Sequence, residues 1–334
     1  MSTDLAGIES TAAASALPRP RRIEAIDALR GVALAAMFTY HFTWDLGYFG
    51  FIASDFPEEP GFKAYGHAIA SLFLALVGVS LVLAEKHASW RPYLLRLAKI
   101  VAAAALVTLG TYYFAPDQLI FFGILHCIAA VSIAALPFLR APVPVTLAAA
   151  LAALALPIFI ASTALDGPWI WLGLGAQVPS TLDWRPFLPW FGVVLLGLAV
   201  ARGFPPDRWP QHFVMWTSRH WPTKSLAWGG RHSLFVYLVH QPIFLAVLYL
   251  VAQMAGVKPE AAEAPFLRNC ENQCTATGAT TTYCGNVCRC IVVRAQGSDL
   301  WSKMLAQSPD PADQDRFRSV TRECARDERP PEPP

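Results

Sequence analysis

Charged residues are scarce in this sequence. Only 15% of its 334 residues are Asp, Glu, Lys or Arg, and 54% are hydrophobic, whereas soluble domains carry roughly 25% charged residues. The formal net charge is +2, which gives no support to nucleic-acid binding because that function needs a basic surface. The composition therefore favours an integral membrane protein over a soluble domain.

Several common catalytic motifs are also missing. The chain contains no Walker loop, no Gly-x-Gly-x-x-Gly after a strand pattern, no His-Glu-x-x-His and no Gly-x-Ser-x-Gly. These patterns mark NTPases, dinucleotide enzymes, zinc peptidases and serine hydrolases, so none of those chemistries is supported, and we expect no metal cofactor. Residues 1–22 begin with an Ala/Ser/Thr-rich stretch without an apolar core, which is typical of a disordered cytosolic tail.

Seven apolar segments are long enough, or nearly so, to cross about 30 Å of hydrocarbon. We therefore predict an all-α fold, a polytopic membrane bundle of about seven transmembrane helices. A weaker patch at 169–174 is typical of a re-entrant or interfacial piece, because tryptophans favour the membrane surface. The seven segments are residues 27–50, 66–84, 94–114, 119–138, 143–162, 187–201 and 232–254.

Positive charges alternate between the predicted loops. Lys and Arg gather before the first segment and in every second loop after it, whereas the loops between hold only Lys63 and Arg185. Cytoplasmic loops carry such an excess, which predicts a cytosolic N-terminus and an extracytoplasmic C-terminal tail. The predicted division is a cytosolic tail 1–22, a transmembrane domain 23–257, an extracytoplasmic cysteine-rich segment 258–307 and a charged, Pro-rich disordered tail 308–334.

Six of the seven cysteines lie beyond the last predicted segment. An even number of closely spaced cysteines on an oxidising side indicates two or three disulfides, whose pairing the spacing leaves open. A zinc knuckle is the alternative, but the tail has no histidine and its Cys-x3-Cys and Cys-x-Cys spacings fit zinc sites poorly. The six residues are Cys270, Cys274, Cys284, Cys288, Cys290 and Cys324.

The first segment carries four ionisable groups on one helical stripe. At about 100° per residue, Arg30 and His41 fall roughly 20° apart, with Asp27 three residues before Arg30 and Asp45 four after His41. Charged side chains in lipid cost several kcal/mol and face a protein interior or a wet cavity. His41, oriented by Asp45, fits a general base, and Arg30, about 16 Å away along the helix, fits the phosphates of an anionic donor. The alternative is a structural Asp27–Arg30 pair with His41 as a packing residue.

Further polar residues lie in later segments. His126 lies in the fourth segment, while Tyr237 and His240 share a face of the seventh. Each histidine alone is typical of an interhelical hydrogen bond, but together with two acids and a membrane arginine they favour a polar site. The catalytic candidates are His41, Asp45, His67 and His126, and the candidates for binding the acyl donor are Arg30, Asp27, Arg231, His240 and Tyr237.

Five short motifs, in this order, resemble a known group of membrane enzymes. The first helix of acyltransferase family 3 enzymes carries an arginine–histidine pair, and Arg30 and His41, separated by ten residues, resemble it. The wider pattern, over about residues 20–255, is similar to bacterial relatives of heparan-α-glucosaminide N-acetyltransferase. The motifs are Ile26-Asp27-Ala28-Leu29-Arg30-Gly31, His41-Phe42-x-Trp44-Asp45-Leu46, Phe122-Gly123-Ile124-Leu125-His126, Pro189-Trp190-Phe191-Gly192 and His232-Ser233-Leu234-x5-His240-Gln241-Pro242.

This resemblance implies a membrane O- or N-acetyltransferase that moves an acetyl group from cytosolic acetyl-CoA to an extracytoplasmic glycan or amino sugar. Together with the loop charges, it implies a bacterial inner-membrane protein with a periplasmic C-terminal tail. In the lysosomal branch an asparagine matches His41 and the catalytic histidine lies in the loop that follows; the only histidine near that loop in this chain is His67, at the start of the second segment. We therefore rank His41 first and His67 second. The expected partners are membrane lipid, acyl-CoA and the acceptor, and a homo-oligomer is compatible with the sequence. A proton-coupled transporter or exporter using the same Asp/His/Arg stripe is the alternative function.

Overall fold

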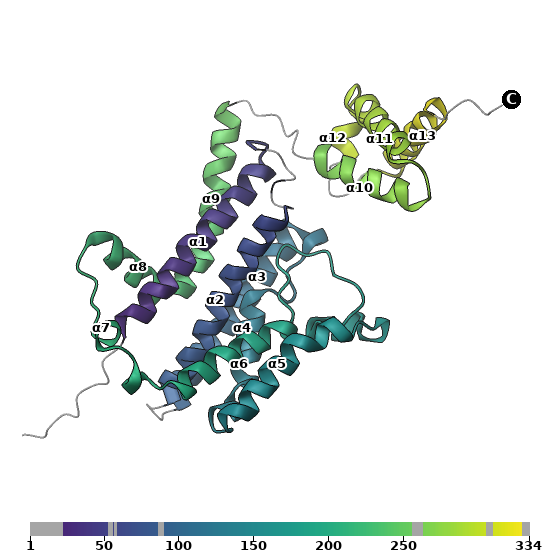
Figure 1. Ribbon diagram of the computed structural model, residues 1–334. Helices are drawn as coiled ribbons and strands as arrows, with labels where there is room; N and C mark the ends of the chain where they lie inside the picture. The colour runs from purple at the N-terminus through teal and green to yellow at the C-terminus, as the bar shows by residue number, and fades with distance from the viewer. Residues whose placement is uncertain are drawn as a thin grey trace, which may run out of the picture.

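The computed structural model describes residues 23–52, 56, 59–85, 90–255, 263–304 and 310–328. Within these ranges every named element is a helix, apart from one isolated bridge between Ser162 and Gly175 (Figure 1). The all-α prediction is confirmed. The predicted N-terminal tail, 1–22, lies outside the described residues.

The helices fall into a first group that contains the membrane-type segments and a second group in the tail. The first group is α1 (Glu24–Tyr48), α2 (Pro60–Glu85), α3 (Trp90–Phe114), η2 (Pro116–Gln118), α4 (Ile124–Ala134), η3 (Leu136–Leu139), α5 (Val143–Phe159), η4 (Thr163–Leu165), η5 (Gly167–Leu172), α6 (Phe187–Gly203), η6 (Pro206–Arg208), α7 (Gln211–Val214), α8 (Trp221–Arg231) and α9 (Ser233–Ala255). The second group is α10 (Glu263–Ala276), α11 (Thr281–Gln296), α12 (Leu300–Met304) and α13 (Pro311–Asp327).

Three helices, α2, α3 and α9, are long and apolar enough to cross a membrane, and α4, α5 and α6 are apolar but shorter. Each of the seven predicted segments coincides with one of α1–α6 and α9, while the number of spans stays a prediction. The fourth segment differs most, because α4 begins at Ile124 and not at 119. The stretch before it is tied instead to a distant loop, since Leu182 N donates to Gln118 O and Arg185 N donates to Phe122 O.

The largest apolar cluster lies between α2, α4, α5 and α6. Leu74 and Leu195 are among its fully buried members. Two glycines let α2 and α6 approach closely: an added Cβ on Gly78 would lie 2.1 Å from Val194 O, and one on Gly197 would lie 2.1 Å from Ala75 O. Such small-residue contacts are a common way for membrane helices to pack.

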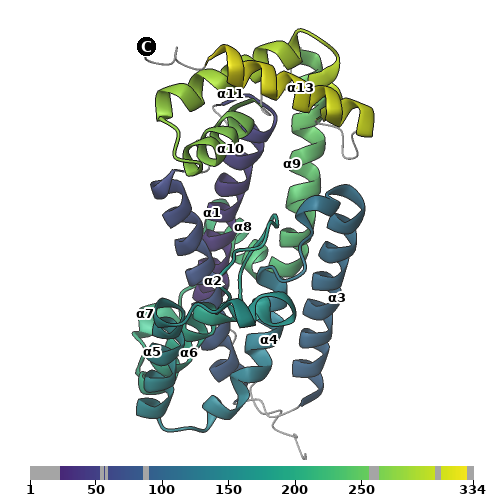
Figure 2. The ribbon, with the colours of Figure 1, turned by 90° about the vertical axis from the view of Figure 1, so that its right-hand side faces the viewer.

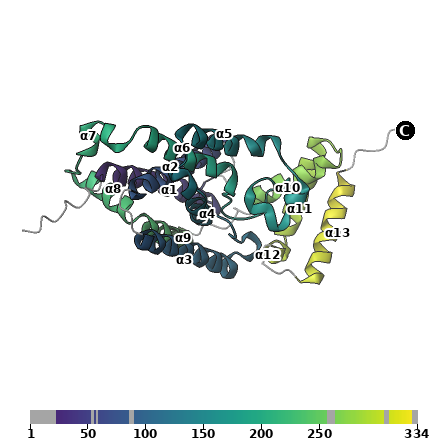
Figure 3. The same ribbon diagram turned by 90° about the horizontal axis from the view of Figure 1, so that it is seen from below.

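The helix α1 lies against α2, α8 and α9, and Figure 2 shows α3 next to α9 on the other side from α1. Seen from below, α3 and α9 run along one side of the bundle and α5 and α6 along the other, with α1, α2 and α4 between them (Figure 3). The polar stripe of α1 therefore faces protein on several sides.

Three disulfides hold the tail helices together, and we call residues 263–328 the disulfide domain. The prediction of two or three disulfides is confirmed. Two bonds join α10 to α11 and the third joins α11 to α13, so none of the six thiols is left to bind zinc. The pairs are Cys270–Cys288, Cys274–Cys284 and Cys290–Cys324.

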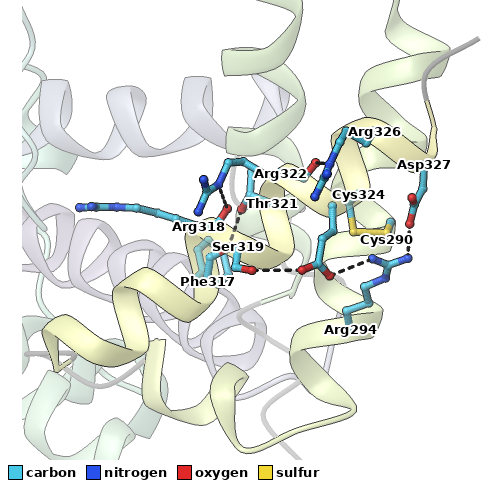
Figure 4. Close-up of polar contacts among 11 residues, drawn as sticks. Cys290, Arg294, Phe317, Arg318, Ser319, Thr321, Arg322, Cys324, Arg326 and Asp327 are labelled. Atoms are coloured by element: carbon cyan, nitrogen blue, oxygen red, sulfur yellow. Dashed lines mark hydrogen bonds and ion pairs between the residues drawn. A yellow bond between two sulfur atoms is a disulfide. The ribbon is translucent and has the colours of Figure 1, made fainter.

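The prediction of disorder over 308–334 is wrong for the part of it that the structure describes, because Pro311–Asp327 form α13. Composition could not reveal the cross-links that order this segment. Besides the disulfide at Cys324, Arg294 of α11 pairs with Glu323 at 3.5 Å and with Asp327 at 2.5 Å (Figure 4). Asp310 caps the helix by accepting a hydrogen bond from Ala312 N.

Candidate functional site

Two carboxylates of α1 are buried near its opposite ends. Asp27 is 1% exposed and Asp45 is 0% exposed, and 18 residues of helix separate them by about 27 Å. A buried carboxylate is stable only with partners that offset its lost hydration. The partners at the two ends differ in number and kind.

At the first end, Asp27 is surrounded by basic and hydroxyl groups that we call the Asp27 cluster: Asp27, Arg30, Arg231 and Ser80. Arg30 Nη1 donates to Asp27 Oδ1 at 2.8 Å, and Arg30 Nη2 donates to Ser80 Oγ of α2. Arg231 Nε lies 3.8 Å from the second oxygen, Asp27 Oδ2. The Asp27–Arg30 pair of the alternative interpretation is thus formed, and the bond from Arg30 to Ser80 links α1 to α2.

Two glycines bring Arg231 to this cluster. An added Cβ on Gly230 would lie 1.7 Å from Asp27 O, and one on Gly31 would lie 2.0 Å from Leu226 O. Because neither residue has a side chain, α8 crosses α1 in direct backbone contact, and the residue after Gly230 reaches Asp27. The Arg231 side chain remains 45% exposed, compared with 18% for Arg30.

A surface cavity of about 430 Å³ lies beside the start of α1. The segment that lines it is anchored by Ser218, which donates to both carboxylate oxygens of Glu24. The hydrogen bond from the Ser218 hydroxyl is the main reason that the pKa of Glu24 lies below its ordinary value, and Arg231 adds to this effect. The cavity is lined by His212, Met215, Trp216, Thr217, Arg219, His220 and Thr223.

At the second end, four side chains from α1 and α9 form what we call the histidine site: His41, Asp45, His240 and Gln241. The two imidazole rings are in contact, with centroids 5.0 Å apart. Gln241 Nε2 donates to Asp45 Oδ1 at 2.8 Å. In the described residues Asp45 makes no hydrogen bond to His41, so the expected Asp45–His41 pair is not formed. Asp45 bonds instead to Gln241, which links α1 to α9.

The histidine site holds buried acceptor atoms without donors. His240 Nδ1 lies 2.5 Å from the carbonyl oxygen of Tyr237, which leaves Nε2 as its other polar atom. Among the described residues, His240 Nε2, Asp45 Oδ2 and Gln241 Oε1 are all buried without a hydrogen-bond partner. Buried polar atoms without partners are few in native proteins, and they often mark functional sites.

A loop contributes a cation that the sequence analysis did not select. Arg185 precedes α6, and its guanidinium carbon lies 5.6 Å from the centroid of the Trp190 ring, which also contacts the His67 ring. Its Nε is buried without a hydrogen bond, and the nearest Asp183 oxygen is 4.0 Å away. The signal that could have found it is its isolation, since it is the only Lys or Arg between 163 and 186.

The remaining histidine candidates lie apart from this centre or are already bonded. His67 is exposed and its ring lies 5.8 Å from that of Trp190, so it borders the Arg185 side of the site. His126 accepts a bond from Gly123 N at Nδ1 and contacts Thr108 Oγ1 at 3.1 Å through Nε2. Because both of its nitrogens are engaged, His126 braces the start of α4 against α3.

One comparison with known proteins identifies a relationship. The family model described as "Heparan-alpha-glucosaminide N-acetyltransferase, catalytic" matches residues 22–242. This range includes the Asp27 cluster and ends just after Gln241, whereas the disulfide domain lies outside it. No curated protein and no solved structure matches the chain.

Proposed function

This chain belongs to the heparan-α-glucosaminide N-acetyltransferase catalytic family, and we propose that it transfers an acetyl group from acetyl-CoA to a glycan or amino-sugar acceptor across a membrane. The donor binds near the Asp27 cluster, and the acceptor's amine or hydroxyl reacts at the histidine site. The expectation of a membrane acyltransferase agrees with the family; the donor and the acceptor are part of the proposal.

One observation carries the proposal above all: the unpartnered acceptors in the histidine site. His240 Nε2, Asp45 Oδ2 and Gln241 Oε1 can each receive a hydrogen bond. An acceptor substrate presents N–H or O–H groups, which match this set, and its proton must be removed as it attacks a thioester. A buried imidazole is suited to that task.

The Asp27 cluster supports a donor site. Arg231 is half exposed and only loosely paired with Asp27, so it is available for the phosphates of CoA, which guanidinium groups bind strongly. The nearby cavity, lined by Trp216 and Arg219 among others, has the aromatic and basic character that an adenine nucleotide requires. The arm of CoA would then run along α1 toward His41, about 16 Å from Arg30.

Arg185 and Trp190 support an acceptor site at the other end of α1 from the Asp27 cluster. Arg185 lies on the loop that leads into α6; its nearest carboxylate oxygen, on Asp183, is 4.0 Å from Nε, and Nε makes no hydrogen bond to the described residues. Sugars commonly stack on aromatic rings, and a guanidinium binds hydroxyl or acidic groups. With the charge asymmetry of the loops and the disulfide-bonded tail, this favours a cytosolic donor end, a periplasmic acceptor end and a location in a bacterial inner membrane.

The test is direct. The purified full-length protein in lipid nanodiscs receives radiolabelled acetyl-CoA, with glucosamine or the glycan fraction of host membranes as acceptor. We expect label in the acceptor and one free CoA thiol for each acetyl group transferred. The proposal is refuted if the protein neither transfers label nor releases CoA with either of the two acceptors.

A proton-coupled transporter is the second candidate, because buried Asp and His side chains in membrane helices also form proton relays, and Asp45 and His240 are such a pair in one site. The same protein in liposomes separates the two functions. Acidification or amino-sugar uptake driven by a pH gradient without acetyl-CoA would favour transport. Strict dependence on acetyl-CoA favours the acetyltransferase.

A further inference from the structure

We propose that His240, and not His41, takes the proton from the acceptor's amine or hydroxyl during acetyl transfer. This inference rests on the proposed function and deepens it, since it decides which of two touching imidazoles reacts. The sequence alone placed His240 with the donor-binding residues and ranked His41 first as the base.

The orientation of His240 is set by its own helix. A carbonyl oxygen can only accept a hydrogen bond, so the contact of 2.5 Å from Tyr237 O requires the hydrogen to be on Nδ1. In the neutral ring Nε2 then carries the lone pair, which is the form that a general base needs. The Tyr237 carbonyl thus does for His240 what we expected Asp45 to do for His41.

The surroundings of His240 hold this lone pair ready. The side chain is 6% exposed, its ring stacks on Phe38 at 5.3 Å, and Phe244 meets it edge-on at 5.9 Å. Within the described residues, no donor reaches Nε2. An unsatisfied buried acceptor costs about 1–3 kcal/mol, and an N–H or O–H of the substrate would remove that cost on binding.

His41 lacks the same preparation. Neither of its ring nitrogens makes a hydrogen bond to the described residues, and Asp45 bonds to Gln241 instead. The groups that face His240 are His41 at 5.0 Å, the Tyr237 ring at 5.6 Å and, through Gln241, Asp45. His41 therefore forms a wall of the pocket, while the tautomer that can accept a proton is fixed only at His240.

The step balances without any other reactant. The acceptor nitrogen or oxygen attacks the thioester carbonyl carbon, and its proton passes to His240 Nε2 as the new C–N or C–O bond forms. Collapse of the tetrahedral intermediate breaks the C–S bond, and the electron pair leaves with the CoA sulfur. The proton on Nε2 then goes to that sulfur, which restores neutral His240, and the Nδ1 bond to Tyr237 O is kept throughout.

The test compares three variants of the full-length protein in nanodiscs, with radiolabelled acetyl-CoA and glucosamine as probes. His240→Asn removes the Nε2 acceptor and keeps a short amide at the position. His41→Gln removes the neighbouring imidazole. His232→Gln is the matched control, because its Nδ1 also lies near a carbonyl of its own chain, Trp228 O at 2.9 Å, but its side chain is exposed.

We expect His240→Asn to lower kcat by about 10²–10⁴-fold with little change in the KM for acetyl-CoA. The rise of kcat with pH, which reports deprotonation of the base, should be lost in this variant and kept in His41→Gln. His232→Gln should behave as the wild type. The inference is overturned if the rise with pH is lost in His41→Gln and kept in His240→Asn.

Stability is measured alongside, by thermal unfolding and acetyl-CoA binding. If His240→Asn does not fold, His240→Ala with added imidazole decides: restored transfer supports the inference, whereas intact acetyl-CoA binding without restored transfer contradicts it. A wild-type protein that transfers no acetyl group at all is a different result, because it refutes the proposed function and this inference with it.

Discussion

The two ends of α1 carry the same functional group in opposite circumstances. Asp27 has both oxygens matched by guanidinium groups, from Arg30 and Arg231. Asp45 is equally buried, but one oxygen bonds to Gln241 and the other bonds to nothing among the described residues. A satisfied buried carboxylate contributes to the fold, whereas an unsatisfied one is kept at a cost in stability. From this difference we expect Asp27 to act in the fold and Asp45 in the proposed reaction.

The most direct test of this comparison is to replace each aspartate of α1, Asp27 and Asp45, by asparagine. Asp27→Asn leaves the half-buried Arg30 and the exposed Arg231 without their counter-charge. Removing one partner of a buried pair costs about 3–5 kcal/mol, and we expect the cost here to come mainly from Arg30. Asp45→Asn removes no ion pair, so we expect near-normal stability with acetyl transfer reduced by about 10²-fold or more. Thermal unfolding and label transfer measure the two effects. A stable Asp27→Asn protein would show that the Asp27 cluster is not structural.

The accessibility of the cysteines in the disulfide domain shows on which side of the membrane the C-terminal tail lies. If its side is oxidising, a membrane-impermeant thiol reagent labels the tail of intact cells only after reduction. Replacing both Cys290 and Cys324 by Ser should destabilise this domain by about 2–4 kcal/mol without changing acetyl transfer. Labelling without reductant would argue against the disulfides in cells. Labelling only after permeabilisation would put the tail in the cytosol and exchange the sides of donor and acceptor.

The two arginines of the Asp27 cluster sharpen the comparison further. Arg231→Gln should weaken acetyl-CoA binding by about 10–100-fold, because a hydrogen bond to a charged group contributes about 1.5–3 kcal/mol. Arg30 bonds to both Asp27 and Ser80, so Arg30→Gln should lower the unfolding temperature more than it lowers donor affinity. Equilibrium binding of labelled acetyl-CoA distinguishes them. The reverse ranking would make Arg30 the phosphate ligand that its place in the sequence first suggested.

Of the substitutions expected to change acetyl transfer or donor binding, replacement of Arg185 should have the smallest effect. Arg185→Met retains an unbranched apolar stem that can cover Trp190 but removes the charge, and we expect the kcat/KM for the acceptor to fall about tenfold with the Kd for acetyl-CoA unchanged, as for loss of one charge-assisted bond. Arg185→Lys serves as the control that keeps the charge. An equal loss in donor affinity would remove Arg185 from the acceptor side.

The helices and the polar stripe could be predicted from the sequence because both depend on local periodicity. Runs of apolar residues place α1–α6 and α9, and the spacing of Asp27, Arg30, His41 and Asp45 puts them on one face of α1. The cysteines predicted disulfides by their number and place. These signals need no knowledge of which helix lies next to which.

Only the tertiary structure decided the partners. A spacing of four residues places His41 and Asp45 on one face of α1. Asp45 nevertheless bonds to Gln241, 196 positions away, because α9 packs beside α1 and places the Gln241 amide within hydrogen-bond distance of the carboxylate. Arg231 reaches Asp27 because Gly31 and Gly230 leave no side chain between α1 and α8. The loop before α6 places Arg185 against the Trp190 ring. Each pairing depends on how distant segments pack, and that is set by the shape of the whole bundle and not by the pattern of any one segment.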